Sequence, residues 1–418
     1  MTRREGLTTV YRGLPTSVYV VFFSRIVNSV GNLVFPFLSL YLTTKLGLGK
    51  AEAGLFLTLS SLVYVPASMI GGKIADHFGR KALLVGGMAL SALFLAPCGF
   101  LSTSSWVPWL LIISRFFGAL AEPAYGALIA DLTTPANRKA TFSLLYLGHN
   151  MGFAVGPMVA GFLFQRHLPW LFIGDAVTTL LSVALVAWYV PDSSPHQGAD
   201  GAAEEHLLPE SERAESGSVL AVLRRRPILL IGSFLFLAYN LVYSQHIFSL
   251  PIQTEALFGG RGAVYYGTLM SVNAITVVAL TSMVTTLTLQ VRPMASMGLA
   301  GLLYALGFGM IYFIHSQPLL ILSTVVWTVG EVLNTVNLGV FIANNTPSSH
   351  RGRVNATLNV IGGMGWTLGP WLAGLWIQSH SVQSVWPIAF FLALATALLM
   401  FAFNGAGSAQ QKPVAADS

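Results

Sequence analysis

The stretch Gly152-Phe-Ala-Val-Gly-Pro-Met-Val-Ala-Gly161 lies inside a long apolar segment and decides the fold. A second copy of its pattern, G-x-x-x-G-P-x-x-A-G, runs from Gly365 to Gly374, 213 positions further on (365 − 152 = 213). Glycines four residues apart give a helix a smooth face on which another helix packs closely, and the proline removes a backbone donor and bends the helix. The two copies predict a duplicated membrane protein.

Composition supports this prediction. Of the 418 residues, 54% are hydrophobic and only 9% are charged, against about 25% charged in soluble domains. The net charge of +6 does not indicate nucleic acid, because the basic residues are scattered between apolar runs and form no stripe. The single cysteine, Cys98, excludes an intrachain disulfide. Without H-x-x-x-H spacing or a Walker loop, we expect no metal, no cofactor and no ATP hydrolysis.

Twelve apolar runs reach the roughly 20 residues that a membrane-spanning helix needs. They are residues 17–42, 51–72, 82–101, 108–130, 139–165, 170–190, 227–256, 263–289, 294–315, 318–344, 353–379 and 385–403. If the N-terminus is cytoplasmic, 16 Lys and Arg fall in inner segments and 4 in outer ones. The positive-inside rule therefore predicts that both termini are cytoplasmic.

The polar stretch 191–226 separates two sets of six spans. It is acidic and then basic and contains glycine, which is typical of a flexible linker, although a short surface helix around Glu212 to Leu223 is possible. We therefore divide the chain into residues 1–190, a linker at 191–226, residues 227–405 and a tail at 406–418. Gly126-Ala-Leu-Ile-Ala-Asp131 also has a counterpart in Gly339-Val-Phe-Ile-Ala-Asn344. Parallel six-helix halves predict a substrate held between them near the midplane.

A second motif, Gly72-Lys-Ile-Ala-Asp-His-Phe-Gly-Arg-Lys81, stands between the second and third spans. We expect a short loop here, in which the glycines allow a tight turn. Asp76 and Arg80 are expected to pair with each other or with charged groups at neighbouring helix ends. The alternative is a plain turn with positive-inside lysines.

Together these motifs resemble the major facilitator superfamily, and in particular its twelve-helix drug:proton antiporters, which include the lactococcal multidrug transporter. Leu120-Ala-Glu-Pro-Ala-Tyr-Gly-Ala-Leu is similar to that group. The sequence departs from the family pattern at Ile74, His77 and Ala119, and a glycine copy in the eleventh span is unusual. The resemblance implies an all-α fold of two pseudo-symmetric halves and gating roles for both motifs. The gating residues are Gly72, Asp76, Gly79, Arg80, Lys81, Gly152, Gly156, Pro157, Gly161, Gly365, Gly369, Pro370 and Gly374.

Charges inside spans are functional candidates, because each costs on the order of 3 kcal/mol or more at mid-bilayer. Glu122 and Glu331 lie in the corresponding fourth and tenth spans, where a carboxyl can alternate between neutral and charged forms and so exchange a proton for a cation. Packing carboxyls are the alternative. Arg115 and Asp131 are further candidates for proton coupling. Arg115 is two turns from Glu122, too far for a direct pair, and is expected either to tune the proton affinity or to pair structurally, while Asp131 would join the cytoplasmic network. Asp175 and Glu255 are interpreted as interfacial charges near the outer surface.

Polar and aromatic residues in several spans are candidates for the substrate site. In the first span Arg25, Asn28 and Asn32 share a helix face, although Arg25 could instead reach the lipid headgroups. The remaining candidates are His149, Asn150, Tyr239, Asn240, Tyr243, Trp327, Asn334 and Trp366. The alternative for each is helix packing or contact with lipid.

These patterns predict a secondary transporter, not an enzyme, in a bacterial inner membrane. We expect it to act as a monomer within membrane lipid and to export small lipophilic molecules, with cations favoured, in exchange for protons. A flippase for a lipid or glycolipid, or an exporter of one metabolite, is the alternative of the same fold. A receptor would need a soluble output domain, and an intramembrane enzyme would need a nucleophile and a base at helical spacing.

Overall fold

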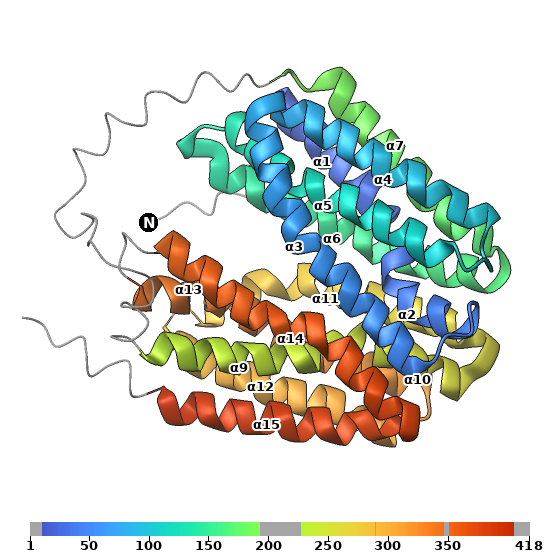
Figure 1. Ribbon diagram of the computed structural model, residues 1–418. Helices are drawn as coiled ribbons and strands as arrows, with labels where there is room; N and C mark the ends of the chain where they lie inside the picture. Colours follow the sequence, from blue (N-terminus) through green and yellow to red (C-terminus); the bar gives the residue numbers. More distant parts are fainter. Residues whose placement is uncertain (1–10, 193–226, 289, 347–350, 405–418) are drawn as a thin grey trace, which may run out of the picture. The chain divides into compact units, whose positions relative to one another are not determined.

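The computed structural model describes residues 11–192, 227–288, 290–346 and 351–404, and every regular element within them is a helix (Figure 1). Most of the expected linker, the possible helix at Glu212 to Leu223 and the expected tail lie outside the described residues. Two compact units are present. The first comprises the described residues of Met1–Ala199 with Leu250–Val278, and the second those of Asp200–Ser249 with Ala279–Ser418.

Seven helices precede the linker. They are α1 (Thr16–Val30), α2 (Val34–Thr44), α3 (Lys50–Phe78), α4 (Arg80–Phe100), α5 (Val107–Asp131), α6 (Pro135–Arg166) and α7 (Leu168–Tyr189). Among them α4 packs along both α5 and α7, and α1 packs along α6 and α7. The apolar core of these helices includes Leu84, Ala121 and Val186, which are all buried.

Seven more α-helices follow the linker. They are α9 (Pro227–Tyr243), α10 (Ser249–Phe258), α11 (Gly262–Thr288), α12 (Pro293–Met310), α13 (Gln317–Asn345), α14 (Arg351–Ser379) and α15 (Val385–Phe403). Short 3-10 turns interrupt or extend them at Ser244–His246, Gly259–Arg261, Ile311–Phe313 and Val382–Ser384. In the second unit α12 packs against α13 and α15, and α9 packs against α14 (Figure 1).

The helices follow the expected spans closely, with two interruptions. The first span is broken at Gly31–Leu33 into α1 and α2, and the seventh is broken after Tyr243 into α9 and α10. The breaks fall on Gly31-Asn32 and Ser244-Gln245-His246, polar interruptions too short to end an apolar run, so a span read from apolar length alone is continuous there. Within the described residues, ten segments are long and apolar enough to cross a membrane, and one of them, Pro227–Thr288, contains α9, α10 and α11. The number of twelve crossings stays a prediction.

The prediction of a short loop at residues 72–81 is wrong. Helix α3 continues through most of the motif to Phe78, and α4 begins at Arg80, so only Gly79 separates them. Gly79 has a φ of 93°, a conformation that glycine adopts without steric cost. The motif therefore forms the last turns of one helix, a one-residue corner and the start of the next helix.

The two glycine stretches make the same contact twice. A Cβ on Gly152 would lie 2.6 Å from the carbonyl oxygen of Ile26 in α1. A Cβ on Gly365 would overlap the carbonyl oxygen of Leu237 in α9. The two partners are 211 positions apart (237 − 26 = 211), close to the spacing of the glycines. Helix α6 thus packs on α1 as α14 packs on α9, as the duplication predicts.

The end of the first glycine stretch has a different partner. Within the first unit, a Cβ on Gly161 would lie 2.6 Å from the carbonyl oxygen of Ala263 in α11. A Cβ on Gly267, one turn further along α11, would lie even closer to the carbonyl oxygen of Pro157. Backbone meets backbone at this crossing with no side chain between, which is how small residues let membrane helices approach.

Candidate functional site

The main cavity of the first unit has a volume of about 340 Å³, within the range of small-molecule sites. It is bordered by residues of all seven helices of that unit that precede the linker. Its polar and charged lining consists of Arg25, Asn28, Ser29, Asn32, Ser60, Tyr64, Ser91, Ser114, Arg115, Glu122, His149, Asp175 and Thr179. Phe35, Phe56, Leu95 and Leu111 are among its apolar lining.

Helix α5 presents two charges to this cavity, Arg115 and Glu122. The Arg115 guanidinium lies 5.2 Å from the ring centres of both Phe35 and Tyr64. Within the described part of the chain the ion pairs are Arg80 with Asp131 and Lys81 with Asp192, so Arg115 and Glu122 do not pair directly. Both still act electrostatically on the Tyr64 phenol.

Arg25 of α1 lines the same cavity. Its guanidinium lies 5.0 Å from the ring centre of Tyr125, one turn beyond Glu122 on α5. Arg25 and Glu122 also border a smaller adjoining space of about 40 Å³. Of the two interpretations of Arg25, the structure favours the cavity wall over a side chain extended to headgroups.

Asp175 is not the exposed interfacial charge that its position in the sequence indicates. It lies in α7, lines the cavity and is only partly exposed. Its Oδ2 accepts hydrogen bonds from the backbone N–H groups of Leu33, at 3.0 Å, and Val34, at 3.1 Å. The Val34 N–H stands at the start of α2, where no preceding turn supplies an acceptor. The Leu33 N–H also donates to the Gly31 carbonyl at 2.7 Å. The break in the first span therefore explains why a carboxylate is buried here.

The other polar candidates of the first unit divide into two groups. Asn28, Asn32 and His149 line the cavity, and the His149 Nδ1 lies 2.8 Å from the Ser29 hydroxyl. The Asn28 amide donates to the Thr179 hydroxyl over 3.4 Å. Asn150 is buried and donates to the Tyr146 carbonyl within its own helix, which is a packing role.

The second unit contains an aromatic cluster around His246, a residue that the sequence did not single out as a site. Its ring centre lies 4.3 Å from that of Tyr243 and 5.6 Å from those of Trp327 and Trp366. Trp327 is fully buried, and its indole nitrogen has no hydrogen-bond partner among the described residues. Tyr243 and Trp366 are partly exposed, so they are the accessible members of this cluster.

The remaining candidates of the second unit are held by the protein itself. Tyr239 is fully buried and its hydroxyl donates to the Met297 carbonyl at 3.0 Å. The Asn240 amide donates to the Gly362 carbonyl at 3.0 Å. Asn334 is buried as well. Glu331 of α13 is partly exposed and acts electrostatically on the Tyr304 phenol.

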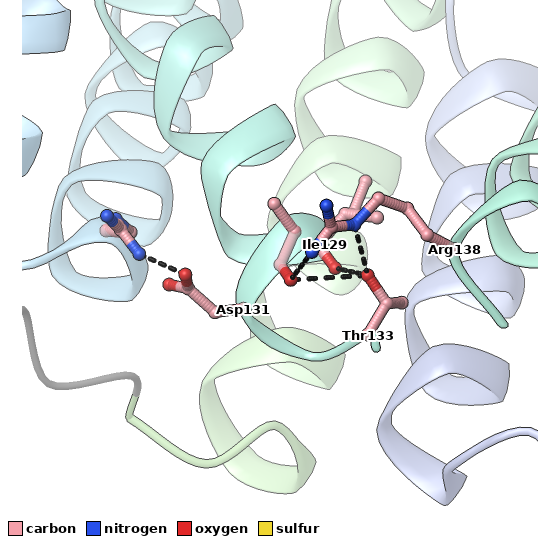
Figure 2. A network of polar contacts seen from close by, with 6 residues as sticks. Ile129, Asp131, Thr133 and Arg138 are labelled. Carbon is pink, nitrogen blue, oxygen red and sulfur yellow. Dashed lines mark hydrogen bonds and ion pairs between the residues drawn. The ribbon is translucent and has the colours of Figure 1, made fainter. Parts of the chain in front are cut away.

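The motif at 72–81 contributes a charge contact at the end of the bundle. Arg80, at the start of α4, forms an ion pair with Asp131, the last residue of α5 (Figure 2). Beside it, the Thr133 hydroxyl donates to the Ile129 carbonyl at 2.8 Å, and Arg138 donates to Thr133 (Figure 2). Arg80 thus pairs with Asp131 and not with Asp76, which is exposed.

Several lining residues were not predicted for the site, and Tyr64 and Asp175 are two of them. Tyr64 has no charge or motif to mark it, and it joins the site because α3 packs against α5. Asp175 had a usable signal, since Gly31-Asn32 followed by Pro36 indicates a helix break whose N–H groups need an acceptor.

Sequence comparison identifies the family. The model of the Major Facilitator Superfamily matches residues 20–338 and 291–414. An uncharacterised transporter of this superfamily from Bacillus subtilis, YqjV, is 25% identical over 92% of this chain and 90% of its own length. Multidrug resistance protein MdtH of Photorhabdus laumondii is 32% identical, but over 41% of this chain and 43% of its own length.

Solved structures agree with this fold. A peptide transporter POT, in a mutant form, superposes with a TM-score of 0.76 at 18% identity, covering 96% of this chain and 97% of the other. The nucleoside transporter NupG, also as a mutant, gives a TM-score of 0.74 at 14% identity, covering 92% of this chain and 99% of the other. Likeness at such low identity concerns the fold alone. With the helical architecture and the family match over most of its length, this chain belongs to the Major Facilitator Superfamily and is a multi-pass membrane transporter.

Proposed function

We propose that the protein exports small lipophilic molecules that carry a positive charge, in exchange for protons. The observation that carries this proposal is Glu122, a carboxylate that faces a membrane-embedded cavity and belongs to no ion pair among the described residues. Resemblance to the multidrug resistance protein MdtH, over part of both chains, supports an export function. We also propose that the protein acts as a monomer in a bacterial inner membrane, with both termini in the cytoplasm.

The coupling follows from what a carboxyl in such a cavity can bind. It is satisfied either by its own proton or by a cationic group, and the two compete for the same oxygens. A substrate cation entering from the cytoplasmic side displaces the proton from Glu122. After the halves rock, a proton from outside displaces the substrate. Competition for one site is sufficient to link the two movements in opposite directions.

Glu331 supplies a second carboxyl on the corresponding helix of the other half. At the spacing of the repeat Glu331 corresponds to Gly118 and Glu122 to Thr335, so each acid stands four residues along its helix from the counterpart of the other. If both titrate, one monovalent cation can exchange for two protons. Tyr243 and Trp366, beside His246, are the accessible aromatic surface that suits the apolar body of a substrate.

Gating is assigned to the two backbone-close contacts and the ion pair. The crossing of Gly161 and Gly267 with the carbonyls of Ala263 and Pro157 brings α6 and α11 together without side chains. Arg80 and Asp131 join the start of α4 to the end of α5. Rigid contacts of this kind let a group of helices move as one body.

A flippase for polar headgroups is less well supported. Polar side chains in the seventh span would favour a substrate with a polar headgroup, but those side chains are bonded within the protein. The Tyr239 hydroxyl and the Asn240 amide bond to backbone carbonyls, and the Gln245 amide donates to the Leu241 carbonyl at 2.9 Å. Packing accounts for these residues, which leaves no separate observation in favour of a headgroup.

The test uses inverted membrane vesicles that hold an imposed pH gradient. A lipophilic amine, a neutral drug and a sugar are added in turn, and we expect only the amine to dissipate the gradient. Glu122→Gln should abolish this response. Glu52→Gln is the matched control, because Glu52 is exposed at the first turn of α3 and lines no described cavity. An equal response from the wild type and Glu122→Gln would remove Glu122 from the mechanism.

A further inference from the structure

The cavity of the first unit contains two guanidinium groups, whose presence the export of a simple cation does not explain. Arg25 and Arg115 both line it, and a guanidinium is charged under all physiological conditions. In the part of the chain that the structure describes, neither forms an ion pair. Both guanidiniums lie beside aromatic rings. Arg25 lies over Tyr125, and Arg115 lies over Phe35 and Tyr64.

Within the described helices, the two acids of the cavity, Asp175 and Glu122, form no ion pair with these arginines. Asp175 is already occupied by two backbone N–H groups at the start of α2. Glu122 is the remaining carboxylate, and in the proposed cycle it is neutral whenever it holds a proton. A ligand with a positive charge alone would pair with Glu122 while it is repelled by two guanidiniums, and their hydrogen-bond donors would stay without an acceptor.

The order of the charges along α5 is suited to a ligand with charges of both signs. Tyr125, beneath Arg25, is three residues after Glu122, and Arg115 is seven residues before it. At about 1.5 Å per residue, Glu122 therefore stands between the two guanidiniums, about 10 Å from the Arg115 level. Glu122 acts electrostatically on both Tyr64 and Tyr125, in keeping with this intermediate position.

Arg115 is the better placed of the two for a ligand. Arg25 also borders the narrow space of about 40 Å³, whereas Arg115 borders only the larger cavity. Phe35 and Tyr64 flank the Arg115 guanidinium and offer flat apolar surface beside it. A guanidinium binds a carboxylate or a phosphate through two parallel hydrogen bonds, which an aromatic ring cannot replace.

We infer that the cavity binds zwitterionic amphiphiles, with the ammonium group of the ligand at Glu122 and its anionic group, a carboxylate or a phosphate, at Arg115. This rests on the proposed function, because the ammonium is the group that competes with the proton. It narrows the substrate class from lipophilic cations in general to lipophilic molecules that carry both charges. A zwitterion leaves neither Glu122 nor Arg115 without a partner.

The test measures binding to purified protein in lipid nanodiscs, without any proton gradient. Four probes share one naphthyl scaffold: an ω-amino acid with a short methylene chain between its charges, its methyl ester, its N-acetyl derivative and the corresponding aminoalkyl phosphate. The ester keeps only the positive charge and the N-acetyl acid only the negative one. We expect the amino acid to bind at least about tenfold more tightly than either singly charged probe.

Variants then assign the anionic contact. Arg115→Gln should weaken binding of the amino acid about tenfold or more, and should leave the methyl ester unchanged or bound more tightly. Arg166→Gln is the matched control, since Arg166 also lies over a ring, that of Phe162, but at the exposed end of α6. The aminoalkyl phosphate decides between the two anion classes, because the tighter of the two zwitterions identifies the preferred group.

Equal affinity for the amino acid and its ester in the wild type would overturn the inference, whatever the variants do. The wild-type comparison needs no substituted protein, so a variant that fails to fold does not obscure the result. If the proposed function fails, the zwitterion still binds more tightly than the singly charged probes, but its binding does not depend on pH. If only this inference fails, the ester still binds and its binding depends on pH.

Discussion

Ser29 of α1 and His149 of α6 are joined by a 2.8 Å hydrogen bond, one turn before the closest glycine contact between these helices. In the second unit the Asn240 amide of α9 donates to the Gly362 carbonyl of α14 at 3.0 Å. Asn240 follows Ser29 by 211 positions and Gly362 follows His149 by 213 (240 − 29 = 211, 362 − 149 = 213), which are the spacings of the glycine contacts. The duplication therefore preserves a polar bridge at the same place although its chemistry has changed.

The glycine contacts should be the most sensitive positions of this helix pair. Gly365→Ala forces a methyl group into the Leu237 carbonyl, and overpacking of this kind typically costs 1–3 kcal/mol. Gly363→Ala, two residues away on α14, meets no atom within 4 Å and should be neutral or slightly stabilising, because alanine favours helix. Thermal unfolding in detergent compares the two. Equal effects would show that α14 does not pack on α9 through Gly365.

Asp175 should matter through its hydrogen bonds to the start of α2. A single oxygen accepts both N–H groups, and the amide oxygen of asparagine can take its place. Asp175→Asn should therefore be nearly as stable as the wild type. Asp175→Ala leaves the Val34 N–H without an acceptor and the Leu33 N–H with the Gly31 carbonyl alone, and it should cost about 1–3 kcal/mol. Chemical denaturation in a mild detergent measures both. A loss as large for asparagine as for alanine would indicate that the negative charge itself is required.

The Arg80–Asp131 pair should keep part of its stabilising effect when the two charges are exchanged. Either Arg80→Asp or Asp131→Arg alone places like charges at the meeting of α4 and α5. The side chains are 25% and 24% exposed, so we expect a loss of about 1 kcal/mol for each single variant. The double variant should recover part of that loss. If it is no more stable than the sum of the single effects predicts, the two residues are not coupled.

The helices could be predicted from the sequence because apolar length and the bilayer thickness determine them. Helix α13, for example, covers Gln317–Asn345, against an expected span of 318–344. The breaks at Gly31–Leu33 and after Tyr243 could not be read from hydrophobicity over the length of a span, because the polar interruptions there are only two or three residues long. The first break is supported by an acceptor from another helix, Asp175, that only the packing provides.

The site was predictable in part from charged and polar residues inside spans, and Asn28, Asn32 and His149 do line the cavity. Arg25, Arg115 and Glu122 were expected from the cost of burying charge, and all three line one cavity. Tyr239 and Trp327 were expected in the substrate site but are fully buried, because aromatic side chains in membrane helices serve packing as readily as binding. Arg80 was expected to pair with Asp76 or with a charged group at a neighbouring helix end, and its partner is of the second kind, Asp131 at the end of α5.

The central claim is that a substrate cation and a proton compete for Glu122. The most direct test records the pH of a weakly buffered solution of purified protein while the naphthyl amino acid is added to saturation. The account predicts that the wild type releases protons as the ligand binds, and that Glu122→Gln still binds the ligand but releases none through this residue. Identical proton release by the wild type and Glu122→Gln, or saturating binding to the wild type with no proton release, would contradict it.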